Sequence, residues 1–192
     1  MSKVIGLLLA AGAGRRMGGP KALMRHDDGT PWTVAARRVL LDGGCADTLV
    51  VLGAAADEAA DLLGDVPIAR ADDWDRGMGA SLAVGLTALA GTSAEAALVH
   101  LVDLPDVGTE VVRRMLARFD GSASLARAVY AGAPGHPVLV GRDHWSAIAA
   151  GTDAEGAREY LAAHHALTVE CGDLASGRDR DRPQDLDPRR DA

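Results

Sequence analysis

Apolar runs and amphipathic stretches alternate along the first half of the chain. Continuous apolar runs, typical of parallel strands covered on both faces, occur at Val4–Leu9, Thr48–Leu52 and Ala97–Val102. Apolar residues at helical spacing, with glycine near the end of the stretch, occur at Trp32–Leu41, Ala56–Leu63 and Ser81–Leu89. This alternation predicts an α/β fold built on a mostly parallel sheet.

The pattern changes after residue 120. Ala126–Tyr130 and Pro137–Val140 flank a Gly-Ala-Pro-Gly turn, which predicts an antiparallel hairpin added to the sheet. From Gly172 onward the chain is polar and charged, and it offers no second apolar core. We therefore expect a single domain over residues 1–187 and a frayed tail over residues 188–192.

Composition narrows the class of protein. The 192 residues are 48% hydrophobic and 24% charged, which excludes a disordered or fibrous chain. Aromatic residues make up 3%, too few for the stacking platforms of single-strand nucleic-acid binders, and a net charge of −7 repels nucleic acid and anionic membranes.

Cys45 and Cys171 fit no zinc or redox spacing, so we expect buried, reduced thiols in a cytoplasmic protein. The first apolar run is too short to span a membrane, and its positive charges follow it, unlike those of a signal peptide.

Positive charge is concentrated in a glycine-rich loop directly after the first strand. Residues 1–26 hold no acidic residue, whereas the loop carries Arg15, Arg16 and Lys21. Its Gly-x-Gly-x-x-x-Gly spacing, starting at Gly12, is one residue longer than the dinucleotide fingerprint, and it lacks the Gly-Lys-Ser/Thr ending of a P-loop. We favour phosphate binding by Arg15 and Lys21 over a tight turn with solvated arginines.

Asp103 follows the third apolar run, and we expect its carboxylate at the same sheet edge as the loop. Mg²⁺ usually takes one or two protein carboxylates together with substrate and water, so Asp103 is a candidate metal ligand; the alternative is a turn or helix-cap aspartate.

The loop resembles the motif of the MobA-like NTP transferase family, which includes the molybdenum cofactor cytidylyl- and guanylyltransferases. The matching pattern is Leu-Ala-Ala-Gly-x-Gly-x-Arg-Met-Gly-x-Pro-Lys. The resemblance implies a Rossmann-like three-layer α/β/α nucleotidyltransferase fold whose loop wraps the triphosphate of an NTP. It implies catalytic roles for Arg15, Arg16 and Lys21, and Ala11 favours CTP over GTP. The nucleotide-binding positions that it implies here are Leu9, Ala10, Ala11, Gly12 and Gly14.

Other segments resemble the family in the same order along the chain. Val102-Asp103-Leu104-Pro105 matches a metal-binding motif, and Asp181 in the C-terminal Asp-x-Asp stretch would complete a Mg²⁺ site, unless that stretch is a solvated charge run. Residues 76–82 resemble a segment that contacts base and ribose, through Gly77, Gly79 and Ser81; read locally, Ser81 is also a helix N-cap.

Two further residues are implied on the acceptor side. His136, in a Gly-His-Pro motif, would bind the acceptor phosphate or pterin, with a plain turn histidine as the alternative, and Arg158 closes a stretch that resembles a family motif but carries inserted residues. We interpret His100, His144, His164 and His165 as structural or exposed, and Trp74 and Trp145 as packing residues.

The resemblance implies transfer of CMP from CTP to a phosphorylated acceptor, and molybdopterin is the acceptor that it favours. It also implies Mg²⁺ as cofactor and a molybdoenzyme as a further candidate partner. Two alternatives stay open. One is an NADPH-dependent oxidoreductase, since a few relatives are described as oxidoreductases. The other is a non-catalytic nucleotide-binding partner of a molybdoenzyme. The second strand runs into Gly53 and Ala54 without the carboxylate that binds an NAD ribose, which argues against NAD.

Overall fold

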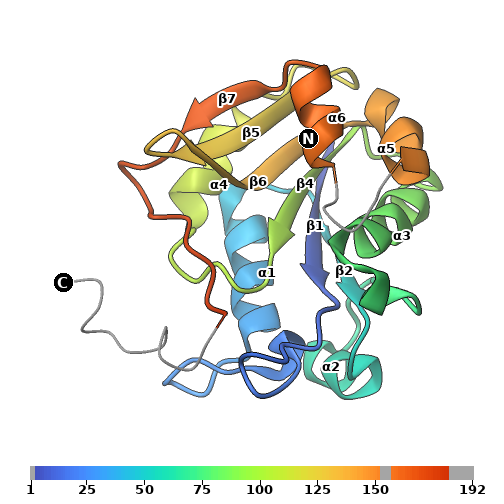
Figure 1. Cartoon of the computed structure of the whole chain (residues 1–192), viewed down its shortest axis with the longest axis vertical. Helices are drawn as coiled ribbons and strands as arrows, with labels where there is room; N and C mark the ends of the chain where they lie inside the picture. Colours follow the sequence, from blue (N-terminus) through green and yellow to red (C-terminus); the bar gives the residue numbers. More distant parts are fainter. Residues whose placement is uncertain (1–2, 152–156, 182–192) are drawn as a thin grey trace.

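The computed structural model describes residues 3–151 and 157–181 and contains one seven-stranded sheet (Figure 1). The strand order is β3-β2-β1-β4-β6-β5-β7. The strands are β1 (Val4–Ala10), β2 (Thr48–Leu52), β3 (Ile68–Arg70), β4 (Ala96–Leu101), β5 (Leu125–Tyr130), β6 (Ala133–Gly141) and β7 (Leu167–Glu170). The predicted α/β class is confirmed.

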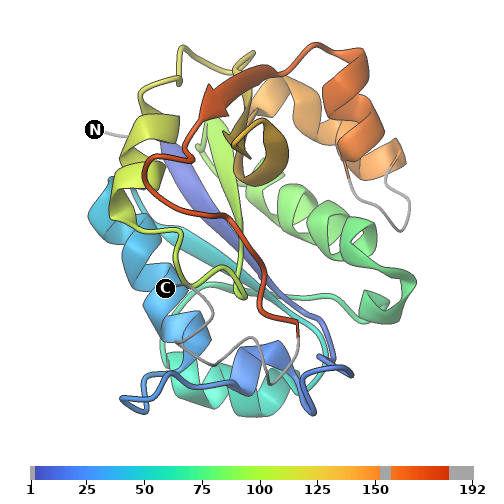
Figure 2. The same cartoon turned by 60° about the vertical axis from the view of Figure 1, so that its left-hand side comes forward.

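Helices cover both faces of the sheet, which gives the expected three layers (Figures 1 and 2). On one face lie α1 (Trp32–Gly43), α2 (Ala56–Leu63) and α4 (Thr109–Leu116), and on the other lie α3 (Met78–Ala90), α5 (Trp145–Gly151) and α6 (Arg158–Ala163). Successive residues of β1 point to opposite faces, so Leu8 is buried in the first core and Leu7 in the second. Short 3-10 turns are η1 (Lys21–Leu23), η2 (Trp74–Arg76) and η3 (Arg142–His144).

The sheet is parallel across β3, β2, β1 and β4, and β6 then pairs antiparallel with β4 and β5. The hairpin prediction is confirmed, but its turn was misplaced. Ala131 and Gly132, with φ angles of 50° and 80°, form the turn, and Gly135 lies inside β6. Two strands were not predicted from the sequence: β3, which pairs parallel with β2, and β7, which pairs parallel with β5.

Helix α3 begins at Met78, three residues before the predicted start. Gly77, at φ 114° and ψ 180°, ends η2 and serves as the N-cap, a conformation that favours glycine. The interpretation of Ser81 as an N-cap is therefore wrong: its side chain is buried in the first turn of the helix.

The described residues include both cysteines, Trp145 and the histidines discussed above. Cys45 and Cys171 are buried and unbonded to each other, as predicted, and Trp145 is buried with its indole N–H donating to the Val140 carbonyl at 2.9 Å. His100 is buried in β4, while His164 is exposed. None of the described helices is long and apolar enough to cross a bilayer. The domain boundary at residue 187 and the tail at 188–192 lie outside the described residues.

Candidate functional site

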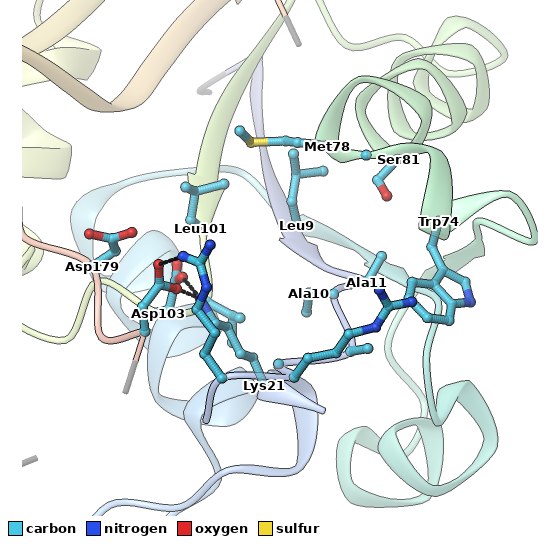
Figure 3. Close-up of a pocket in the computed structure, with 18 of the residues that line it drawn as sticks. Leu9, Ala10, Ala11, Lys21, Trp74, Met78, Ser81, Leu101, Asp103 and Asp179 are labelled. Atoms are coloured by element: carbon cyan, nitrogen blue, oxygen red, sulfur yellow. Dashed lines mark hydrogen bonds and ion pairs between the residues drawn. The ribbon is translucent and has the colours of Figure 1, made fainter. Parts of the chain in front are cut away.

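A cleft of about 480 Å³ opens at the carboxyl ends of β1 and β4, where open α/β sheets bind their ligands (Figure 3). The glycine loop forms one side of the cleft, η2 and the start of α3 form another, and the end of β4 with the segment after β7 forms a third. The predicted residues that line it are Leu9, Ala10, Ala11, Gly12, Gly14, Arg15, Arg16, Lys21, Gly77, Ser81, Asp103 and Asp181. The structure thus brings together most of the residues that the sequence singled out.

The glycine loop folds back on itself at Gly14. This residue has a φ of 54°, and its carbonyl accepts hydrogen bonds from the N–H groups of Met17 at 2.8 Å and Gly18 at 3.0 Å. A Cβ at Gly14 would lie 2.0 Å from the carbonyl oxygen of Gly19, so a side chain does not fit there. Met17 is buried in the core, which leaves Arg15 and Arg16 exposed at the cleft.

Lys21, at the start of η1, joins the loop to the acidic side of the cleft. Its ammonium donates a hydrogen bond to the carboxylate of Asp103 (Figure 3) and another to that of Asp181. The guanidinium of Arg16 lies 3.8 Å from the Asp181 carboxylate. Burial by itself lowers the pKa of Lys21, but the charges and hydrogen bonds of the two carboxylates outweigh it and raise that pKa above its ordinary value. The hydrogen bond from Lys21 in turn holds the pKa of Asp181 below its ordinary value.

The segment after β7 carries two of the three carboxylates at this point. It runs back along the sheet to the end of β4 (Figure 2), where the Arg180 N–H donates to the Asp103 carbonyl at 2.9 Å. This bond positions Asp179 and Asp181 beside Asp103, and ligand atoms of the three carboxylates lie within 4.8 Å of one another. Burial and the neighbouring carboxylates raise the pKa of Asp179.

An all-oxygen donor set of this kind fits Mg²⁺ or Mn²⁺. Asp179 was not among the metal ligands predicted from the sequence. The available signal was its spacing, because residues two apart point to the same side of an extended segment.

The opposite wall of the cleft comes from η2 and α3. Trp74 packs on Gly53, where an added Cβ would lie 2.6 Å from the Trp74 Cβ, and it also lines the cleft, so the packing interpretation describes only part of its position. Gly77 and Ser81 line the cleft as expected. Gly79 is buried within α3 and does not line the cleft.

His136 and Arg158 lie outside the main cleft. His136 lines a small apolar niche that shares Leu9 and Met78 with the cleft, so the two spaces adjoin. Burial, followed by the proximity of His100 and Arg127, lowers the pKa of His136 to about 3, which keeps its imidazole neutral. Arg158 is the first residue of α6, and residues 152–156 of the family-like stretch before it lie outside the described residues.

Comparison with known proteins agrees with this geometry. The chain is 35% identical over 195 residues to nicotine blue oxidoreductase of Paenarthrobacter nicotinovorans, covering 95% of this chain and 94% of that protein. The crystal structure of an Rv0371c homologue from Mycobacterium sp. strain JC1 has a TM-score of 0.81 at 28% identity, covering 95% of this chain and 92% of that one. A nucleotidyl transferase from Methanothermobacter shares the fold, with a TM-score of 0.79 at 24% identity over 95% of this chain and 93% of that one.

The model of the MobA-like NTP transferase domain matches residues 6–168. That range holds the whole glycine loop, η2 with α3, and Asp103, which together make up most of the cleft. The chain therefore belongs to the family of MobA-like NTP transferase domains.

Proposed function

We propose that this protein is a Mg²⁺-dependent nucleotidyltransferase that moves a nucleoside monophosphate from an NTP to a phosphorylated acceptor. The observation that carries the proposal is the meeting of Lys21, on the glycine loop, with Asp103 and Asp181 on the facing side of one cleft. A cationic loop and a carboxylate cluster at a single edge fit the two ends of a metal-bound triphosphate.

In this proposal Asp103 and Asp181 hold the metal, and Asp179 joins them as a third carboxylate. A divalent ion held there would neutralise negative charge on the phosphate oxygens. Backbone N–H groups of the loop, with Arg15, Arg16 and Lys21, bind the triphosphate, while Gly77 and Ser81 lie where the base and ribose would be.

Transfer then proceeds by in-line displacement at the α-phosphorus. An oxygen of the acceptor phosphate forms the new bond to phosphorus, and the bond to the bridging oxygen of the β-phosphate breaks, so pyrophosphate leaves. The attacking phosphate is already ionised and needs no general base. Positioning and charge neutralisation by the loop therefore supply most of the rate enhancement.

The hydrogen bonds of Lys21 suggest what happens before the substrate arrives. Its ammonium neutralises the cluster in the free protein, in contact with two of the carboxylates that would bind the metal. We infer that metal and nucleotide binding releases Lys21 from the carboxylates to the triphosphate, so that one side chain stabilises both states.

Nucleotide and acceptor identity rest on the resemblance of the sequence. Ala11, in the Leu-Ala-Ala-Gly form of the loop, supports CTP. Molybdopterin is the proposed acceptor and a molybdoenzyme the proposed recipient, which fits a cytoplasmic location.

A second candidate function is an NADPH-dependent oxidoreductase. The observation in its favour is the 35% identity, over 95% of the chain, to a protein named nicotine blue oxidoreductase. Hydride transfer, however, gives no role to three converging carboxylates around a lysine. For that reason we place nucleotidyl transfer first.

Thermal unfolding with a panel of nucleotides separates the candidates. A transferase is stabilised by CTP with Mg²⁺, more than by GTP, ATP or UTP, whereas an oxidoreductase is stabilised by NADPH irrespective of Mg²⁺. Pyrophosphate release in the presence of molybdopterin then tests turnover. Asp103→Asn should abolish the release, and Asp120→Asn, at an exposed site away from the cleft, should leave it unchanged. Stabilisation by CTP without any pyrophosphate release would instead indicate the non-catalytic binding protein.

A further inference from the structure

The C-terminal arm (residues 172–181) carries Asp179 and Asp181 to the cleft without the support of a helix or strand. After the turn at residues 172–174, the arm has no regular secondary structure up to residue 181. Figure 2 shows it, in red, running beside the turn that follows β4. The position of both carboxylates therefore depends on the separate contacts that hold the arm to the rest of the chain.

One anchor of the arm is the carboxylate of Asp106. Its Oδ2 accepts hydrogen bonds from both the N–H and the hydroxyl of Ser176, each at 2.6 Å. The same hydroxyl accepts the N–H of Arg178 at 3.3 Å. Hydrogen bonds to a charged acceptor are stronger than neutral ones, so this contact fixes the backbone of the arm at Ser176.

Asp106 belongs to the same short turn as the candidate metal ligand Asp103. Leu104 and Val107 of this turn are buried in the core, and the Val107 N–H donates to the Leu104 carbonyl at 3.3 Å. The turn is therefore packed firmly against the sheet. It carries both a carboxylate of the cluster and the acceptor that binds the arm.

The arm meets this turn at two points. Asp106 binds Ser176, and the Asp103 carbonyl accepts the Arg180 N–H at 2.9 Å. Two separate attachments set the register of the arm against the turn, whereas one would leave the arm free to pivot. The two carboxylates of the arm flank the second attachment, so a slip in register would move them away from Asp103.

A close contact at Gly177 shows how near the arm lies to the sheet. This residue has a φ of 63°, and a Cβ there would lie 2.2 Å from Cδ2 of Tyr130, at the end of β5. The Tyr130 ring is held in turn by its hydroxyl, which donates to the His136 carbonyl at 2.6 Å. The stretch next to Ser176 thus has no room to shift toward the sheet.

Electrostatics at the cluster itself oppose docking of the arm. Ligand atoms of Asp103, Asp179 and Asp181 lie within 4.8 Å of one another, and like charges at such distances repel. Lys21 supplies a positive charge in contact with two of these carboxylates. A favourable contact away from the cluster adds to this stabilisation of the docked arm, and Asp106 provides one.

We propose that Asp106 is a positioning residue for the metal cluster: by binding Ser176, it holds the arm in the register that completes the three-carboxylate site. This inference rests on the nucleotidyltransferase function proposed above, because it takes the cluster as the metal site of that reaction. Asp106 does not line the cleft, so it acts through the arm. Metal binding and docking of the arm are then linked, and each stabilises the other.

Mn²⁺ binding to the full chain, followed by electron paramagnetic resonance of the free ion without nucleotide, tests this role. Asp106→Ala should weaken Mn²⁺ binding by about tenfold or more, the usual loss when a group that orients a metal ligand is removed. Ser176→Ala keeps the backbone N–H donor and should weaken binding about threefold, whereas Ser176→Thr keeps the hydroxyl and should bind like the wild type. Asp143→Ala is the matched control, because Asp143 accepts a hydrogen bond from the Ser122 hydroxyl at 3.0 Å, at an exposed site outside the cleft.

Amide hydrogen exchange separates positioning from a general loss of stability. In Asp106→Ala the peptide spanning residues 172–181 should exchange faster, while peptides from the sheet exchange as in the wild type. Saturating Mn²⁺ should slow exchange of the arm in both proteins, because docking and metal binding are linked. Pyrophosphate release by Asp106→Ala should recover at high Mg²⁺, whereas that of Asp103→Asn should not.

Wild-type Mn²⁺ affinity in Asp106→Ala would overturn the positioning role and leave the metal site intact. An equal loss of affinity in Asp143→Ala, or faster exchange across the whole sheet in Asp106→Ala, would make Asp106 a general contributor to stability and overturn the role as well. If the wild type itself binds no Mn²⁺, the proposed transferase function fails, and the positioning role fails with it. The two failures are therefore distinguishable.

Discussion

Replacing Lys21 with glutamine should change metal affinity and turnover in opposite directions. In the free protein the Lys21 ammonium neutralises Asp103 and Asp181, so a divalent ion must displace it before binding. Glutamine is similar in length but uncharged, and it leaves the carboxylates without their internal cation. We expect the variant to bind Mn²⁺ more tightly than the wild type in the absence of nucleotide, and to lose most of its nucleotidyl transfer.

The burial of the Lys21, Asp103 and Asp181 side chains sets the size of the expected gain in Mn²⁺ affinity. The side chains of Lys21 and Asp103 are 16% and 10% exposed, so their charge-assisted hydrogen bond contributes about 2 kcal/mol. Asp181 is 37% exposed, and solvent screening reduces its share to less than about 1 kcal/mol. A total of about 2 to 3 kcal/mol corresponds to a gain of about 30-fold to about 140-fold in affinity for the metal.

Electron paramagnetic resonance of free Mn²⁺ measures this affinity without nucleotide. Lys21→Arg keeps the positive charge and should bind Mn²⁺ weakly, like the wild type. Lys3→Gln removes a lysine that pairs with Glu95 instead, and should leave Mn²⁺ binding unchanged. Turnover of Lys21→Gln should fall by about 10² to 10³, the usual loss when one charge-stabilising group is removed from a site. Unchanged or weaker Mn²⁺ binding in Lys21→Gln would refute the idea that the lysine occupies the place of the metal.

Three further predictions follow from the packing around the site. Gly14→Ala should weaken CTP binding, measured by calorimetry, at least tenfold, because its Cβ would lie 2.0 Å from the carbonyl oxygen of Gly19. Gly12→Ala is the control, since a Cβ there meets nothing within 4 Å, and equal melting temperatures for the two variants would contradict a strained turn at Gly14. Gly53→Ala should lower the free energy of unfolding in urea by about 1 to 3 kcal/mol and weaken nucleotide binding, because its Cβ would displace Trp74. A variant as stable as the wild type would show that the indole moves aside without cost. Burial lowers the pKa of His100 to about 4, so the unfolded chain alone takes up this proton as the pH falls from about 6.5 toward 4. Between about pH 7 and pH 5, His100 should therefore account for about 2 kcal/mol of the fall in the free energy of unfolding, and a His100→Leu variant that keeps the full wild-type slope would rule out this contribution.

Features encoded over a few neighbouring residues were predictable from the sequence. The apolar runs gave β1, β2 and β4 to within a residue, because strands buried on both faces must be apolar at every position. The glycine loop and the position of Asp103 at the end of a strand were likewise local patterns. The carboxyl ends of parallel strands meet at one edge, which is why the loop and Asp103 could be expected in the same cleft.

Other features depend on contacts between distant segments. β3 and β7 are short and partly exposed, so neither shows a continuous apolar run, and both owe their strand conformation to hydrogen bonds with β2 and β5. Helix α3 begins after Gly77, whose backbone conformation the apolar pattern does not encode, and the burial of Gly79 inside this helix was likewise not predictable from the sequence.

The chemistry of the site also has a part that local sequence determines and a part that depends on tertiary contacts. Sequence alone determined that a basic glycine loop and an aspartate-ended strand belong to one MobA-like domain. Only the tertiary structure decided that Asp179 joins Asp103 and Asp181 in one carboxylate cluster, and that Lys21 neutralises this cluster. The reason is physical: a motif fixes which groups are available along the chain, whereas their burial, charge partners and distances depend on segments that meet only after folding.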